Sequence, residues 1–434
     1  MGSLDARGCP VSGASPAAAH HFEAALASFQ SWRGSVDAPL QRALQEAPGF
    51  AMAHVLRAHA LVSSRDLRRV RQAQSLLDDA AHLAVNPRER LHLAAIGAAA
   101  AGHYDRARDA LDALLAVWPR DALALQVAGT FDYYTGDTAR MLARVESVLP
   151  SWSPELPGYH ALLAQRAFAL EETGDYARAE DQARAALALE PLDVRAHHVM
   201  AHVFEMTDRP AEGLRWMAAQ DVHDAPAAAG SFFTTHCRWH LALFHLALSQ
   251  PDAALAIHDR FMPARRGADI ADLIDAAALL WRLQLQGIAV DTRAQRLAAA
   301  WTPHIDDALC TFSDVHAMLA FVAARDWRSA ERLLAVLAAS QARATRHGRA
   351  SRELGLPACR ALLAFGRGDA ILATTLLASL PAVAHRLGGS HAQRDVLHLT
   401  LLHAVERVRR PAARAGHTHN RSPTTAPTTA PTKG

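Results

Sequence analysis

One spacing recurs along this chain and constrains its fold more than any other feature: a glycine, then a small residue five positions later, then a proline twelve positions beyond that. Two sets of residues follow this spacing: Gly102, Ala107 and Pro119, then Gly174, Ala179 and Pro191. Glycine permits a tight turn between two helices, the small residue lets those helices approach, and proline ends the second helix. The spacing therefore predicts a chain built from antiparallel helical pairs.

The pattern extends to neighbouring positions. Tyr104 and Tyr176 each lie two residues after the glycine, and weaker copies of the unit retain Pro48, Trp327 and Gly368. A helix–turn–helix unit of about 34 residues with these positions is the signature of the tetratricopeptide repeat. Alanine and leucine dominate the composition, which favours helix over strand. We therefore predict an all-α fold, a tetratricopeptide-repeat-like right-handed α-α superhelix (solenoid).

The ends of the chain are expected to differ from its body. Residues 411–434 are rich in proline and threonine without helical periodicity, which is typical of a disordered tail. We expect residues 1–17 to form a flexible N-terminal arm. Residues 18–410 contain no strong break in composition and are predicted to form one continuous solenoid.

Charge and composition exclude several classes of function. The formal net charge is +2, from 45 basic and 43 acidic side chains, so the chain lacks the basic stripe expected of a nucleic-acid-binding protein. The only lysine is Lys433, which excludes Schiff-base chemistry and a P-loop lysine in the folded body. No uncharged apolar run of about 18 residues is present, so no membrane span is expected.

The cysteines bear on the cellular compartment. Cys9, Cys237, Cys310 and Cys359 are far apart and form no C-x-x-C motif. A disulfide framework is therefore not expected, and a cytoplasmic location is predicted. The sequence carries no partner-specific motif and does not define an oligomeric state.

Two histidine pairs are the strongest sign of chemistry. His198, His202 and Glu205 recur at i, i+4 and i+7, so they share one face of the helix that the repeat register starts near Val194. His236 and His240 repeat the i, i+4 spacing on the next predicted inner helix. Imidazoles at this spacing can share one metal ion, and packed helices lie about 8–10 Å apart. These four histidines are predicted metal ligands, for which the implied cofactor is a divalent transition metal; the alternative is a structural hydrogen-bonded network.

Five segments resemble the tetratricopeptide repeat protein 38 family over about residues 20–408. They are "HVMAHVFEM" (198–206), "THCRWHLALF" (235–244), "DLIDAAALLWRLQLQG" (272–287), "FSDVHAMLA" (312–320) and "GGSHAQRDV" (388–396). The resemblance implies a site made of these pattern residues: His198, His202, Glu205, His236, Trp239, His240, Asp275, Asp314, His316, Gln393, Arg394 and Asp395. It implies an architecture and leaves the activity open.

The later segments admit two interpretations. An aspartate on a helix of alanine and leucine needs a partner, because a buried charge must be paired. Arg394 and Arg282 could neutralise Asp275 or Asp314 as ties between repeats. The segment Gln393, Arg394 and Asp395 also has two interpretations. It caps the last helix, or it closes a pocket in which Arg394 binds an anionic group.

Two functions of different classes follow. The first is a binding protein that takes a peptide or a small ligand in a concave groove lined by histidine, aspartate and glutamate. The second is a metal-dependent or acid–base enzyme acting on a small anionic substrate, with Glu205, Asp275 and His316 as its catalytic residues. Imidazole and carboxylate favour proton or metal chemistry, whereas the base rate for repeat proteins favours binding.

Overall fold

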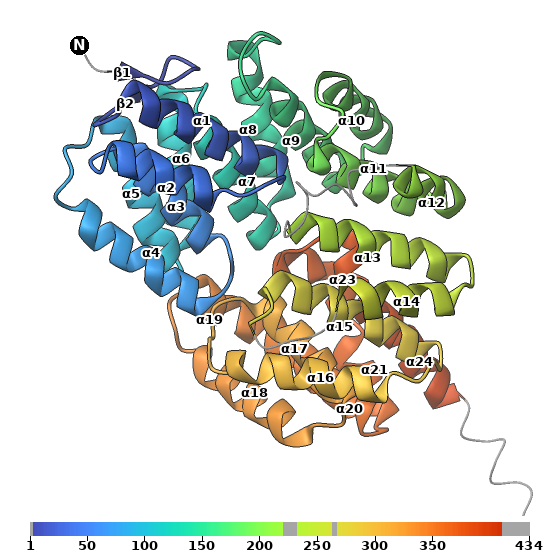
Figure 1. The fold of residues 1–434 in the computed structure, drawn as a ribbon. Helices are drawn as coiled ribbons and strands as arrows, with labels where there is room; N and C mark the ends of the chain where they lie inside the picture. The colour runs from blue at the N-terminus through green and yellow to red at the C-terminus, as the bar shows by residue number, and fades with distance from the viewer. Residues whose placement is uncertain (1–2, 220–231, 263–266, 410–434) are drawn as a thin grey trace, which may run out of the picture.

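The protein is an all-α, tetratricopeptide-repeat-like superhelix. A computed structural model describes residues 3–219, 232–262 and 267–409 (Figure 1). The first part contains β1 (Ser3–Leu4), β2 (Pro10–Val11), α1 (Pro16–Ser31), α2 (Asp37–Glu46), α3 (Ala51–Val62), α4 (Leu67–Ala80), α5 (Pro87–Ala100), α6 (Tyr104–Val117), α7 (Ala122–Thr135), α8 (Thr138–Val148), η1 (Leu149–Ser151), α9 (Tyr159–Glu172), α10 (Tyr176–Leu189), α11 (Val194–Met206) and α12 (Pro210–Ala218). The remainder contains α13 (Phe232–Ala247), α14 (Pro251–Phe261), α15 (Ile270–Leu285), α16 (Asp291–Trp301), η4 (Thr302–His304), α17 (Thr311–Ala323), α18 (Trp327–Ser340), α19 (Arg346–Ala350), η5 (Ser351–Gly355), α20 (Leu356–Gly366), α21 (Ala370–Leu377), α22 (Leu380–Val383), η6 (Ala384–Leu387), α23 (His391–Arg394) and α24 (Val396–Arg409).

The turns inside the helical pairs follow the predicted repeat. Gly102 and Gly174 adopt left-handed φ angles of 77° and 88° between the two helices of their pairs. The small residues Ala107 and Ala179 are fully buried where those helices meet. The turns therefore have the geometry from which we predicted helical pairs.

The inner helices are enclosed on all sides. Every residue of α17 is buried, as are residues 194–204 of α11 and 273–283 of α15. A helix that is apolar around most of its circumference packs against neighbours in every direction. The open concave groove that we expected is therefore filled at these three helices, and the functional groups of α11 and α15 lie in the protein interior.

Contacts between distant parts of the chain close the superhelix. The backbone N–H of Arg346 donates to the carbonyl of Gly102 over 3.2 Å, and its guanidinium donates to the carbonyl of Thr135 over 2.8 Å. The Tyr133 hydroxyl donates to Oε1 of Gln393 over 2.7 Å. Figure 1 shows the first helices and the last helices on either side of this closure, with α11–α13 completing the circuit. The closure brings α7 and α23 to one site.

The N-terminal segment differs from the expected flexible arm. Residues 3–15 are placed in the structure, where β1 pairs antiparallel with β2. Arg7 and Cys9 are buried, and Arg88 forms an ion pair with Asp5 over 3.2 Å. Arg7 also binds Glu23 of α1 over 2.8 Å. These ionic contacts, between residues far apart in sequence, order a segment that lacks helical periodicity; the predicted tail (411–434) lies outside the described residues.

One segment reaches the length and apolarity of a membrane span. Ala370–Leu387 has a mean hydropathy of 1.4, which by itself is weak evidence for a span. The structure divides this segment into α21, α22 and η6, and α21 packs against α20 and α24. A continuous helix would satisfy every backbone group in lipid, whereas this segment is interrupted after Leu377.

The closure can be tested at a repeat glycine. A Cβ atom at Gly136 would overlap the carbonyl of His385, whereas one at Gly174 would meet nothing within 4 Å. Both residues have positive φ, so an alanine costs about 1–2 kcal/mol of backbone strain at either site. We expect Gly136→Ala to lower the free energy of unfolding by about 1–3 kcal/mol more than Gly174→Ala, from the added overlap. Urea unfolding followed by circular dichroism measures the difference, and equal losses would contradict the closure.

Candidate functional site

Four buried histidines converge between two consecutive inner helices. His198 and His202 come from α11, and His236 and His240 come from α13, with at most 3% of each residue exposed. One ring nitrogen from each of the four lies within 4.8 Å of the others. The Nε2 atoms of His198 and His202 are 2.9 Å apart. The two i, i+4 pairs therefore face one volume, as the repeat register predicted.

A carboxylate lies behind three of the four rings. His236 Nδ1 is 2.7 Å from Asp275 of α15, and His240 Nδ1 is 3.0 Å from Glu205 of α11. His202 Nδ1 lies 3.4 Å from Glu171 of α9. A carboxylate at Nδ1 favours the tautomer that carries its proton there, which places the lone pair of the ring on Nε2, an atom that can bind a metal ion. The arrangement fits the second shell of a metal centre.

Burial sets the protonation states of the rings. Loss of hydration lowers the pKa of His198 and of His240 well below 6.5, so both rings are neutral. Burial is the largest influence on the pKa of His202 and acts to lower it, but the charge and hydrogen bond of Glu171 together with the charges of Glu172 and Glu205 outweigh burial, and the net shift is upward. Nε2 of His240 has no hydrogen-bond partner among the described residues. A neutral imidazole with an unused lone pair is the form that binds a transition metal.

The carboxylates near the histidines differ in exposure: Glu171 and Glu172 are buried, whereas the side chain of Glu205 is 24% exposed. Burial raises the pKa of Glu205 to about 7. Burial, followed by repulsion from Glu171, raises the pKa of Glu172 to about 8. Glu171, Glu172 and His202 form a second group whose ligand atoms lie within 4.8 Å of one another. The interior therefore concentrates acidic groups on the side of the histidines that faces α9.

Gln393 links the cluster to the end of the chain. Its side-chain N–H donates to Asp275 Oδ1 over 3.1 Å, and its Oε1 accepts from Tyr133. Gln393 is held in place by a capping box with Ser390 at the start of α23. The cap and the site were predicted as alternatives for this segment; in the structure the same residue takes part in both.

Other predicted site residues lie elsewhere or take different partners. Arg394 lies 3.6 Å from Glu172 and donates to the carbonyl of Gly389. Asp314 pairs with His347 over 2.8 Å. The expected ties from Arg394 or Arg282 to Asp275 and Asp314 are therefore replaced by histidine and glutamine partners.

Three further predicted site residues contribute no ligand atom to the four-histidine cluster. Trp239 is fully buried, and its ring stacks on His236 at a centroid distance of 5.3 Å. His316 donates from Nδ1 to the carbonyl of Phe312 over 2.8 Å and packs against its ring. Asp395 is half-buried at the start of α24, where its carbonyl accepts from the backbone N–H of Leu399.

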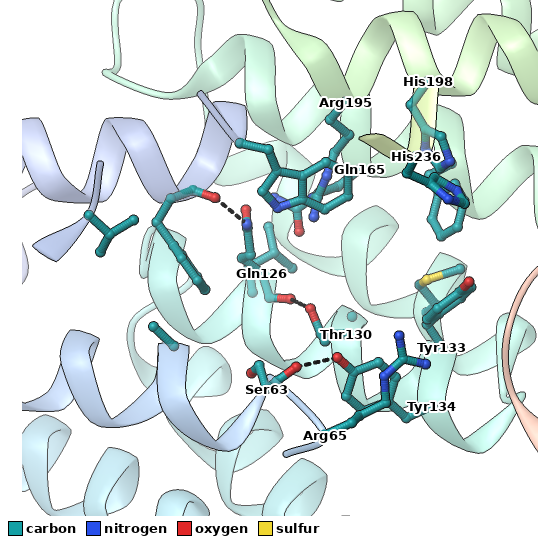
Figure 2. Close-up of a pocket in the computed structure, with 18 of the residues that line it drawn as sticks. Ser63, Arg65, Gln126, Thr130, Tyr133, Tyr134, Gln165, Arg195, His198 and His236 are labelled. Atoms are coloured by element: carbon teal, nitrogen blue, oxygen red, sulfur yellow. Dashed lines mark hydrogen bonds between the residues drawn. The ribbon is translucent and has the colours of Figure 1, made fainter. Parts of the chain in front are cut away.

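A cavity of about 350 Å³ adjoins the histidine cluster. His198, His236 and Gln393 form part of its wall, whereas Glu205, Asp275 and His316 do not. Figure 2 shows His198 and His236 at one end of the cavity and Ser63 and Arg65 at the other. The cavity extends from the cluster toward α3 and α7.

Four residues of this region escaped the sequence analysis. Glu171 and Glu172 form a pair of buried acids that end the apolar helix α9, a local signal that was available. Arg65 lies in the turn between α3 and α4, and Arg195 precedes the histidine pair on α11. Their role depends on the closure of the superhelix, which no local pattern reports.

The fold and the site together define a tetratricopeptide-repeat-like α-solenoid with a buried histidine–carboxylate cluster beside an internal cavity. No family model matches the chain. Among solved structures it is similar to a chain of the APC/C hetero-tetramer Cut9–Hcn1, with 13% identity and a TM-score of 0.38. The match covers 81% of this chain and 62% of that one, so this chain spans less than two thirds of that chain's length. The assignment of the fold is based on the helical pairs and their turns.

A pH prediction follows from His316. Burial lowers the pKa of His316 to about 4, against 6.5 for an exposed histidine. The unfolded chain therefore binds this proton between pH 6.5 and 4 while the folded chain does not, so stability falls as the pH falls through this window. We expect His316→Phe to remove about 3 kcal/mol of that loss. Urea unfolding at pH 7 and pH 4 measures it; an identical loss in both proteins would show that His316 titrates normally.

Proposed function

We propose that His198, His202, His236 and His240 bind one divalent transition metal ion. The observation that carries this proposal is the convergence of one nitrogen from each ring within 4.8 Å, with carboxylates placed behind three of the rings. Neutral imidazoles are suited to zinc, copper, nickel and iron. In a purely structural network, a hydrogen-bond donor should satisfy the Nε2 lone pair of His240. The described residues supply no such donor.

We propose further that a small molecule binds in the adjoining cavity, against His198 and His236. A volume of about 350 Å³ is typical of small-molecule sites. The packing of α11, α15 and α17 on all sides favours a small ligand over a peptide, because a peptide needs a long accessible groove.

The geometry favours positioning roles for two of the residues expected to be catalytic. Glu205 and Asp275 contact the Nδ1 atoms of His240 and His236 and do not line the cavity. They are therefore suited to orienting the rings rather than to removing a proton from a ligand. A metal-dependent enzyme remains our second candidate, because the pKa of Glu205 near 7 suits proton transfer.

We also propose membership of the tetratricopeptide repeat protein 38 family. Support comes from the quoted segments, four of which supply residues to one place: His198 and His202, His236 and His240, Asp275, and Gln393. A cytoplasmic location is likewise our proposal, supported by four cysteines that are all free thiols.

Metal content tests the four-histidine site. We expect the purified protein to bind about one equivalent of zinc or cobalt, and His240→Ala to lose it, because removal of one ligand breaks the coordination sphere. His197→Ala is the matched control, since the neighbouring His197 is also buried but bonds the carbonyl of Pro191 over 2.9 Å. Elemental analysis and cobalt absorption spectra measure binding. No metal in the unaltered protein, or equal loss in both variants, would contradict the proposal.

The carboxylates give a second test. We expect Asp275→Asn to weaken zinc binding by about 10–100-fold, as is typical when a second-shell partner is changed. The asparagine keeps the shape of the side chain but removes the charge that holds the His236 proton at Nδ1. Competition with a zinc chelator measures the affinity. Asp314→Asn is the control, because Asp314 pairs with His347 and should leave the affinity unchanged.

A further inference from the structure

Two arginines in the cavity wall are buried and have no carboxylate partner among the described residues. Arg195 is 6% exposed and its guanidinium lies over the ring of Trp32 at 3.9 Å. Arg65 is 8% exposed and lies over Tyr134 at 4.9 Å. Within the described chain no acidic side chain forms an ion pair with either one, and Nε of Arg195 has no hydrogen-bond partner. Both line the cavity.

Other arginines near the cavity have the counter-ions that these two lack. Arg144 pairs with Asp132 and with Asp112, and Arg69 pairs with Asp269 over 3.0 Å. A buried guanidinium without a counter-ion is costly, and its contact with an aromatic face offsets only part of that cost. Arg195 and Arg65 are therefore suited to binding a negatively charged ligand.

Arg65 and Trp32 lie in the turns that follow α3 and α1, with φ angles of 59° and 56°. Asp208, Ser249 and Arg325 adopt the same left-handed region in the turns of other helical pairs, so this conformation is a property of the repeat turn. The turns after α1 and α3 place large side chains in the cavity wall.

The rest of the wall combines polar residues with apolar and aromatic ones. Phe29, Leu125, Met141 and Phe168 are among its apolar side chains. Asp269 also lines the cavity, where it pairs with Arg69. Figure 2 shows Arg195 beside His198 and Arg65 beside Tyr134, so the two cations occupy different ends. We propose that the cavity binds an organic oxyanion, a carboxylate or a phosphate ester, with its charge on Arg195 or Arg65 and its apolar body against these side chains. This deepens the proposed function by naming the ligand class; the binding itself does not require the metal ion.

Isothermal titration of the full chain tests this inference, using phenyl phosphate, benzoate and neutral benzamide as probes. Each probe is titrated into protein stripped of metal and into protein loaded with zinc. We expect at least one anion to bind one-to-one in both forms, with benzamide weaker by about ten-fold or more, because the charge is what the arginines recognise. The stronger anion identifies phosphate or carboxylate as the preferred group. Equal binding of all three probes, or no binding of either anion, would overturn the inference.

Variants locate the binding. Arg195→Gln and Arg65→Gln should each be tested, and we expect at least one to weaken anion binding by about ten-fold or more. Arg184→Gln is the control, because Arg184 also lies over a tryptophan, Trp216, but pairs with Glu180 outside the cavity. If one variant fails to fold, the other and the comparison of probes on the unaltered chain still decide. Anion binding without zinc binding would remove only the proposed metal site; zinc binding without anion binding would remove only this inference.

Discussion

The site depends on the burial of imidazole rings in their uncharged form. A charged ring would lose its hydration in the interior, so His198 and His240 remain neutral at neutral pH. A neutral ring still has one donor and one acceptor to satisfy. Asp275 and Glu205 satisfy Nδ1 of His236 and His240, and one ring nitrogen from each of the four histidines lies within 4.8 Å of the others. Four inner helices, α9, α11, α13 and α15, supply this arrangement, so the site exists only because the repeats stack in order.

The helical spacing of residues predicts both the repeat register and the faces on which the histidine pairs lie. The glycine-to-proline spacing fixed the repeat register, and α11 begins at Val194, where that register placed it. The i, i+4 spacing then placed His198 and His202 on one face, and the same reasoning placed His236 and His240 on the next inner helix. Both inferences use only properties of neighbouring turns of helix, which a sequence records directly.

Contacts between distant residues could not be obtained in this way. Tyr133 and Gln393 are separated by 260 positions, and Asp275 and Gln393 by 118. Their meeting depends on the small rotation that each repeat adds, summed around the superhelix, and no local pattern records that sum. For the same reason Arg394 was expected to be an anchor for an anion, whereas it pairs with Glu172.

The separation of charge across the histidine cluster explains why a cation and an anion could both be held within one small interior. Glu171, Glu205 and Asp275 lie at Nδ1 of three of the rings, outside the cavity lining, and create a negative potential where a metal ion would sit. Arg195 and Arg65 lie on the cavity side and create a positive potential there. An anion in the cavity would therefore face two arginines, with the rings of His198 and His236 in the same wall. Removing the carboxylates would weaken the hold on the cation, and removing the arginines would weaken the hold on the anion, so the two halves of the site can be examined independently.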